Sequence, residues 1–252
     1  MDALECKKYA LHEVEKLSGK PVIIHRDPTL TFKAKIRFAQ ENQPAHVLSY
    51  QPKMADQLPY LVCYQCGYIR RFFLCPEKDR LNVGANAKTF AFVEELVRDR
   101  WKTTKQDAPL NSLVTYSRMI TDGLGAQLRS VPIGLRVELL INEQFEALRS
   151  MQRTTIMEQL QDNLECLHPK YRESVPSQIF EANAGMNAAF ACFWADLWGE
   201  EVHAVPYKVA GYGPIADQLM ELFRSIPKQP QHDRALVLAW AEKLGIAGLY
   251  VI

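Results

Sequence analysis

The chain has 252 residues, of which 48% are apolar, and its formal net charge at pH 7 is +1. This length and apolar content are sufficient for a sizeable buried core, in one large domain or two small ones. A net charge so close to zero gives no electrostatic signature of a nucleic-acid-binding or anionic-membrane-binding protein.

Neither export nor membrane insertion is indicated by the sequence. The first 20 residues contain four acidic side chains and no apolar run as long as that of a signal peptide. No window approaches the roughly 18 uninterrupted apolar residues of a membrane-spanning helix. The six cysteines are therefore expected to be reduced thiols, and the predicted location is cytoplasmic.

A helix is predicted at the start of the chain, followed by three short strands. Asp2 and Glu5 have the spacing of a capping box, and Gly19 is a typical residue to end the helix. Short β-branched or alternating segments then predict strands at residues 21–25, 31–38 and 46–50. Three short strands in succession predict a small antiparallel sheet.

The second of these predicted strands has one apolar and one basic face. Its basic face carries Lys33, Lys35 and Arg37. Strict alternation of this kind is typical of a strand with one face buried and the other in solvent. The basic face is accordingly interpreted as a solvated sheet surface, with an anionic partner as the alternative.

The rest of the chain has the apolar periodicity of helices. One helix is expected to end before Pro76, and a later helix rich in aromatic side chains is expected to lie in the core. The helical segments are predicted at residues 58–73, 90–97, 110–128, 133–148, 156–164, 180–198, 219–223 and 236–244. The predicted fold is a predominantly helical α+β fold, in which an N-terminal region with the small sheet (residues 1–150) and a helical C-terminal region (residues 151–252) share one continuous core.

The helix predicted at residues 58–73 contains a degenerate form of a zinc-peptidase motif. Such a motif reads His-Glu-x-x-His, since residues four apart share a helix face and the glutamate activates the metal-bound water. The same frame here consists of Tyr64, Gln65, Cys66, Gly67 and Tyr68. A phenol with an ordinary pKa of about 10 is a poor zinc ligand, and glutamine cannot accept a proton from water. No catalytic residue is therefore assigned.

The surroundings of this frame resemble the IrrE/ImmA-like metallopeptidases over roughly residues 1–75. The resemblance consists of the order helix, three strands, helix, of the strand segment 46–50, and of the segment 59–62 leading into the motif helix. It implies a zincin-like fold and a link to regulation, stress or mobile elements, from which a regulatory or defence role is expected. The family's metal ligands do not carry over, because Tyr64 and Tyr68 replace the histidines. Glu138 is interpreted either as a remnant of a third acidic ligand or as a surface or ion-pair residue.

Cysteines and arginines near the frame suggest two alternatives. Cys63 and Cys66 form a CxxC pair and Cys75 follows, so these thiols could hold a structural zinc with a fourth ligand such as His46 or His25. The alternative without a metal is that these cysteines are simply buried thiols.

Arg70 and Arg71 could instead line an anion or ester site beside Tyr64, in a hydrolase with an unrecognised site, or simply stabilise the end of the helix. The leading hypothesis is a non-catalytic, zincin-like protein without a cofactor that binds an unidentified protein partner.

Overall fold

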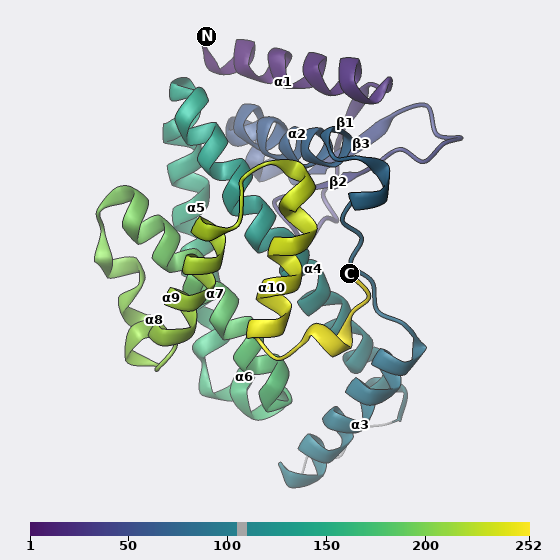
Figure 1. Cartoon of the computed structure of the whole chain (residues 1–252), viewed down its shortest axis with the longest axis vertical. Helices are drawn as coiled ribbons and strands as arrows, with labels where there is room; N and C mark the ends of the chain where they lie inside the picture. The colour runs from purple at the N-terminus through teal and green to yellow at the C-terminus, as the bar shows by residue number, and fades with distance from the viewer. Residues whose placement is uncertain (105–109) are drawn as a thin grey trace. The chain divides into compact units, whose positions relative to one another are not determined.

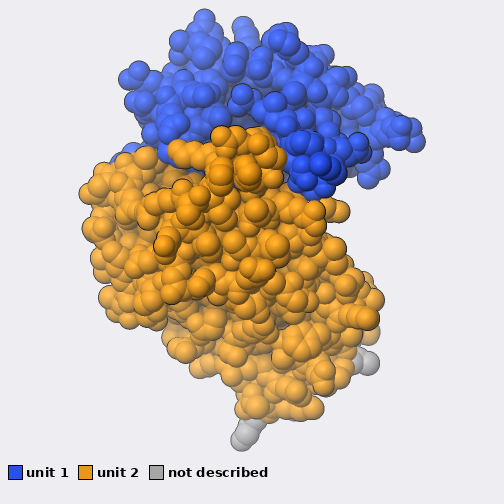
Figure 2. All heavy atoms as spheres, viewed as in Figure 1, with its two compact units in different colours: residues 1–80, 134–158 blue, residues 81–133, 159–252 orange. Residues whose placement is uncertain are grey.

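The computed structural model describes residues 1–104 and 110–252, and the chain divides into two compact units (Figure 2). Unit 1 consists of residues 1–80 and 134–158, and unit 2 consists of residues 81–133 and 159–252. Within the described ranges, no helix is long and apolar enough to cross a membrane.

The units do not follow the division at residue 150 that was predicted from the sequence. Residues 81–133 group with the C-terminal helices, and residues 151–158 group with the N-terminal region. Each unit is therefore assembled from segments that are distant in sequence, which periodicity along the chain does not indicate.

Unit 1 contains the sheet and the helix that carries the degenerate motif (Figure 1). Two further helices, α4 and α5, each contribute residues to both units. The elements are α1 Ala3–Ser18, β1 Val22–Arg26, β2 Ala34–Arg37, β3 His46–Tyr50, η1 Pro52–Gln57, α2 Leu58–Leu74, η2 Glu77–Asp79, α4 Leu110–Gln144, η3 Glu146–Leu148 and α5 Arg149–Asn163.

The start of α1 confirms the predicted capping box. The Asp2 carboxylate accepts a hydrogen bond from the Glu5 backbone N–H at 2.8 Å, and the Glu5 carboxylate accepts one from the Asp2 N–H at 2.7 Å. Gly19 ends the helix with φ 71°, a left-handed conformation that suits glycine. One face of α1 is buried and packs beside α2 (Figure 1), through Cys6, Ala10 and Val14.

The sheet is mixed, which corrects the antiparallel sheet predicted from the sequence. Its strand order is β1-β3-β2, and β3 pairs antiparallel with β2 but parallel with β1. Consecutive strands with short connections suggested successive hairpins. Instead β3, whose His46 and Leu48 are fully buried, takes the central position and pairs with both other strands.

The sheet has one covered face and one open face. Side chains of all three strands on the covered face belong to the core of unit 1 or pack against it, among them Val22, Ile24, Ala34, Ile36 and Leu48. The open face includes Ile23 and His25 of β1 and Lys35 and Arg37 of β2, all of which are exposed. The alternation predicted for residues 31–38 is therefore confirmed for β2, Ala34–Arg37. Lys33, which was predicted on the solvated face, lies outside the strand and instead pairs with Glu158 at 2.9 Å and donates a hydrogen bond to the Thr155 carbonyl at 2.8 Å.

Helix α4 runs without interruption where the sequence predicted two helices. Pro132 lies inside it, although proline has no N–H for the helix ladder. The flanking side chains Leu128, Ile133 and Leu135 are all buried. An interior proline costs a helix about 3 kcal/mol, through the missing hydrogen bond and the clash of its ring with the preceding turn. Burial of the three flanking side chains, at about 1.5–3 kcal/mol each, together exceeds this cost.

Unit 2 is helical apart from an isolated bridge between Gly84 and Val251. The aromatic helix α7 lies in its core as predicted, with Phe190, Phe193 and Trp194 buried. The remaining elements are α3 Ala87–Thr103, η4 Leu164–Leu167, α6 Pro169–Ser174, α7 Ser177–Trp198, η5 Glu201–His203, α8 Val205–Val209, α9 Gly213–Ser225, η6 Pro230–His232, α10 Asp233–Lys243 and η7 Ala247–Leu249. The whole chain is thus a predominantly helical α+β protein.

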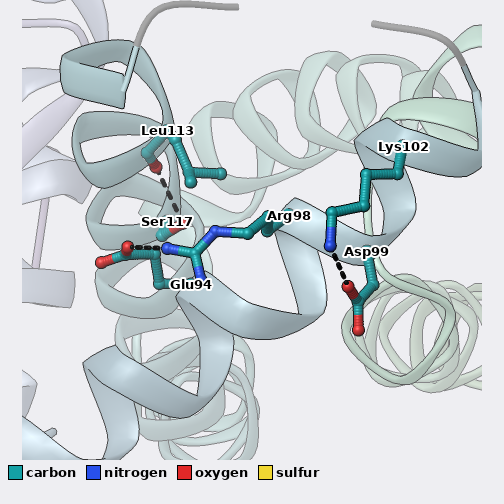
Figure 3. A network of polar contacts seen from close by, with 6 residues as sticks. All are labelled: Glu94, Arg98, Asp99, Lys102, Leu113 and Ser117. Atoms are coloured by element: carbon teal, nitrogen blue, oxygen red, sulfur yellow. Dashed lines mark hydrogen bonds and ion pairs between the residues drawn. The ribbon is translucent and has the colours of Figure 1, made fainter.

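The polar contacts of α3 are surface interactions. Figure 3 shows the ion pairs between Glu94 and Arg98 at 2.7 Å and between Asp99 and Lys102 at 3.3 Å, with the hydroxyl of Ser117 bonded inside α4 nearby. Exposed pairs of this kind contribute at most about 1 kcal/mol each. They stabilise the solvent side of α3 and do not form a site.

Candidate functional site

Three tyrosines line one face of α2. Tyr60, Tyr64 and Tyr68 are four residues apart, so they lie one above the other on the helix. Ring centroids are 6.1 Å apart between Tyr60 and Tyr64 and 5.2 Å apart between Tyr64 and Tyr68. The hydroxyls of Tyr64 and Tyr68 are 2.9 Å apart and share a hydrogen bond. Positions 64 and 68 therefore do form the shared face that the motif frame requires.

Glu138 of α4 lies beside this tyrosine face. The Tyr60 hydroxyl donates a hydrogen bond to its Oε1 at 2.5 Å, and Gln152 of α5 donates to its Oε2 at 2.6 Å. Gln152 also donates to the backbone carbonyl of Glu138 at 2.9 Å. All three side chains are at most 2% exposed. Of the two interpretations of Glu138, the surface residue is thus wrong, because the carboxyl group is enclosed in a polar cluster.

Two glycines bring α2 and α4 into close contact at this cluster. A Cβ atom on Gly134 would lie 2.6 Å from the Tyr64 hydroxyl and 2.7 Å from the Tyr68 hydroxyl. A Cβ atom on Gly67 would lie 2.4 Å from a methyl group of Val137. The phenols of α2 therefore pack directly on the backbone of α4. The hydroxyl ends of Tyr64 and Tyr68 thus lie against α4, although both side chains are only partly buried.

The middle residues of the frame point away from the tyrosine face. Gln65 is buried, and its amide lies 3.5 Å from the carbonyl oxygen of Ala34 in β2, at the outer limit of hydrogen-bond distance. Cys66 is buried in the apolar core of unit 1. Neither side chain belongs to the Glu138 cluster.

Burial controls the protonation of the cluster. Loss of solvent raises the pKa of Glu138 to about 7, although the hydrogen bonds from Gln152 and Tyr60 oppose the shift. Burial, and then the nearby negative charge of Glu138, raises the pKa of the Tyr60 phenol well above its ordinary value. Burial and the adjacent Tyr68 do the same to the pKa of Tyr64. The phenols of Tyr60 and Tyr64 are thus protonated near neutral pH and are not anionic metal ligands.

The arginines of the predicted site lie near the C-terminal end of α2. Glu138 receives its two side-chain hydrogen bonds from Tyr60 and Gln152, not from Arg70 or Arg71. Arg71 is in the last turn, where its charge suits the helix dipole. Arg80 donates a hydrogen bond to the Phe72 carbonyl at 3.2 Å, and its guanidinium lies 4.8 Å from the centre of the Phe72 ring. The structure thus gives Arg80 a clear structural contact at the end of α2.

The cysteines near the frame are buried. Cys63 and Cys66 lie in the apolar core of unit 1 with Cys6. Burial raises the pKa of the Cys66 thiol to about 12 and that of Cys63 further, so both are protonated at neutral pH. Cys75 follows the end of α2 and is also buried. The zinc-binding alternative needs thiolates, and it stays a prediction.

His46, one of the two suggested fourth ligands, has both ring nitrogens occupied. Its Nδ1 accepts a hydrogen bond from the Ala39 N–H at 2.9 Å, and its Nε2 lies 3.0 Å from the Ser18 hydroxyl. Burial lowers its pKa. His25, the other suggested ligand, is exposed on the open sheet face. Within the two described ranges, no three His, Cys, Asp or Glu side chains form a group that could hold a metal ion.

Sequence reasoning missed three members of the cluster. Tyr60 could have been found, because it lies one turn before Tyr64 and continues the same helix face. No feature of the neighbouring sequence indicates Gly134 or Gln152. Their roles depend on contacts with α2 and with Glu138, which are distant or on another helix.

A surface hollow of about 130 Å³ lies elsewhere, in unit 2, lined by residues of α4 and of the segments around Gly84 and Tyr250. It shares no residue with the tyrosine–glutamate cluster, although both include residues of α4.

Comparison with known proteins gives no relative for this chain. No protein-family model, no curated protein and no solved structure matches it.

Proposed function

We propose that this chain is a non-catalytic, zincin-like protein, a pseudo-peptidase that acts in the cytoplasm by binding another protein in a regulatory or defence role. The proposal rests on the resemblance of residues 1–75 to the IrrE/ImmA-like metallopeptidases. It also rests on the chemistry of α2, where phenols and an amide occupy the positions of metal ligands and catalytic base.

The observation that carries the proposal is the closed contact between α2 and α4. A zinc peptidase needs an accessible ion with an exchangeable water in front of the two ligand positions. Here the hydroxyls of Tyr64 and Tyr68 bond to each other and pack on Gly134, where an added Cβ atom would lie only 2.6 and 2.7 Å from them. A helix pair of this kind has a structural role, which fits a protein that kept the scaffold and lost the reaction.

Glu138 gives the proposal further support. It reaches the tyrosine face of α2 from a different helix, next to Tyr60, which is one turn before Tyr64. A carboxylate from a later helix is what a third zinc ligand would require at such a face. Glu138 is thus well placed to be the remnant of that ligand, now held by Tyr60 and Gln152.

A protein that acts by binding a partner needs an accessible surface for it. The open face of the sheet offers one, with Ile23 of β1 at 54% exposure and the cations of Lys35 and Arg37 on the other edge strand, β2. Neither cation forms an ion pair within the described ranges. A partner segment with acidic and apolar side chains would complement this face.

The activity side of the proposal is tested on the native protein. Purified without chelators, it should contain far less than one zinc per chain. It should cleave neither unfolded protein nor peptide libraries, with or without added zinc. Stoichiometric zinc together with proteolysis that chelators abolish would refute the proposal.

The proposed zincin-like origin is tested by restoring the His-Glu-x-x-His motif at residues 64–68. The triple variant Tyr64→His, Gln65→Glu, Tyr68→His should bind about one zinc per chain, with Glu138 as a ligand. Adding Glu138→Gln should abolish stoichiometric binding, and the control Tyr64→Phe, Tyr68→Phe should bind none. A triple variant that folds by circular dichroism but binds no zinc, or binds it equally without Glu138, would contradict the zincin origin.

A further inference from the structure

The surface hollow of unit 2 is lined by the ring of Tyr250, which packs against helix α4. Tyr250 packs on Gly125 of α4, where a Cβ atom would lie 2.7 Å from the ring. Its hydroxyl donates a hydrogen bond to the carbonyl oxygen of Thr121 at 2.8 Å. Tyr250 is only 9% exposed. The contact with α4 and this hydrogen bond hold its side chain in position.

The rim of the hollow is held by hydrogen bonds of the backbone. Gly84 and Val251 exchange reciprocal N–H to carbonyl bonds of 3.0 and 2.9 Å. Arg234 donates a hydrogen bond to the carbonyl oxygen of Ile252 at 2.9 Å, and Ile252 directly follows Val251. The segment around Gly84 and the segment around Tyr250 are thereby joined beside α4, and the hollow is a fixed feature of unit 2.

Two opposite charges of α4 line this hollow. Asp122 and Arg129 are seven residues apart, almost two turns, so they share one helix face with Gly125 between them. Neither side chain makes a hydrogen bond or an ion pair within the described ranges. Helix side chains lean toward the N-terminus, so Arg129 leans back toward Asp122 and the hollow. The hollow is thus bounded by an unpaired carboxylate and an unpaired guanidinium.

We propose that this hollow binds a small zwitterion of the α-amino-acid class, with its ammonium group on Asp122 and its carboxylate on Arg129. The guanidinium fork suits a carboxylate, and an ammonium group forms charge-assisted hydrogen bonds with a carboxylate. The ligand's aliphatic portion then rests on the ring of Tyr250 and on Ala126. This site is separate from the proposed pseudo-peptidase function and does not depend on it.

The size of the hollow limits the ligand. Its volume is about 130 Å³. A protein cavity of about 150 Å³ holds a benzene molecule, so this hollow has room for about six non-hydrogen atoms. Alanine and glycine fit this limit, whereas larger side chains would extend into solvent. A ligand with only one charge would leave one of the two ionic groups without a partner.

Titration of the full-length protein with L-alanine tests the proposal. Chemical shifts of the Gly84 and Gly125 amides should change and saturate. L-alaninamide, which lacks the carboxylate, and N-acetyl-L-alanine, which lacks the ammonium group, should each bind at least about tenfold more weakly, since each loses a charged hydrogen bond. Asp122→Asn and Arg129→Gln should each weaken L-alanine binding to a similar degree. Both side chains are exposed, so these variants are expected to fold.

Matched controls remove a charge outside the hollow. Glu143→Gln, on α4, and Arg26→Gln, at the exposed end of β1, should leave L-alanine binding unchanged. Absence of saturable shifts at millimolar L-alanine would overturn the proposal. So would equal binding of N-acetyl-L-alanine, which would indicate an anion site only, or of L-alaninamide, which would indicate a cation site only. Equal binding by the Asp122→Asn and Arg129→Gln variants would place the ligand elsewhere and overturn it as well.

Discussion

At the scale of single residues, the most unusual group in unit 1 is the carboxyl of Glu138. It is 2% exposed, and its side-chain hydrogen bonds come from a neutral phenol and a neutral amide. Two neutral donors reduce the cost of burying the charge but do not replace bulk water. The pKa of Glu138 therefore rises from 4.5 to about 7.

This shift predicts a pH dependence of stability. Between pH 4.5 and about 7, the unfolded chain releases the Glu138 proton while the folded chain retains it. The free energy of unfolding should therefore fall as pH rises through this window, by up to about 3 kcal/mol in total. Urea unfolding followed by circular dichroism at several pH values across this window measures the effect.

The variant Glu138→Gln isolates the contribution of this carboxyl. It keeps the shape of the side chain and an acceptor for Tyr60, but it does not titrate. Between pH 4.5 and about 7, the free energy of unfolding of this variant should fall less than that of the unmodified protein. The comparison uses the change with pH, so the absolute stability of the variant at acidic pH does not affect it. An unchanged pH slope in this variant would mean that Glu138 is already ionised in the folded protein at acidic pH.

At the scale of elements, the contact between α2 and α4 depends on one glycine from each helix. Gly67 makes room for Val137, and Gly134 makes room for the hydroxyls of Tyr64 and Tyr68. Glycine in a helix costs about 1 kcal/mol relative to alanine. The close approach compensates for this cost by burying Tyr60, Glu138 and Gln152.

The contact predicts opposite effects for two glycine-to-alanine substitutions. Gly67→Ala should destabilise the protein by about 1–3 kcal/mol, because the new methyl group overlaps Val137, a buried β-branched side chain with little freedom to move. Gly123→Ala in α4 should stabilise it by up to about 1 kcal/mol, because nothing lies within 4 Å of the added Cβ atom. Urea unfolding of both variants measures the difference. Equal effects of the two substitutions would disprove the close contact.

At the scale of the whole molecule, unit 1 is built from two separate stretches of chain. Its core combines residues of α1, α2 and the sheet with Val137, Ile141, Phe145 and Leu148, which come from the stretch 134–158. That stretch also supplies Glu138 and Gln152. Without the stretch 134–158, the core side chains of residues 1–80 that pack against it would be exposed to water.

This organisation predicts the behaviour of fragments. The fragment 1–80 should lack cooperative unfolding and have poorly dispersed NMR spectra, since a chain of that size with some of its core missing is marginal. The matched control joins 134–158 to 1–80 through a flexible Gly/Ser linker, and it should recover a cooperative thermal transition. A cooperative transition in fragment 1–80 itself would show that the stretch 134–158 is not needed for folding.

Much of the local structure followed from the sequence. The capping box at Asp2 and Glu5, the strand at residues 46–50 and the helix that carries the tyrosine frame were predicted close to their observed bounds. These features depend on hydrogen bonds and side-chain periodicity within a few residues. The interruption predicted between residues 128 and 133 was wrong, because burial of the surrounding side chains outweighs the cost of Pro132 inside the helix.

The sequence by itself determined that the chain is mostly helical, that Tyr64 and Tyr68 share a helix face, and that this face has no metal-binding imidazole. Only the tertiary structure decided that β1 runs parallel to β3, that Glu138 is buried against Tyr60, and that Gly67 and Gly134 bring α2 and α4 together. The physical reason is the range of the forces involved. Local propensity acts between neighbouring residues, whereas close packing and the burial of a charge depend on residues far away along the chain.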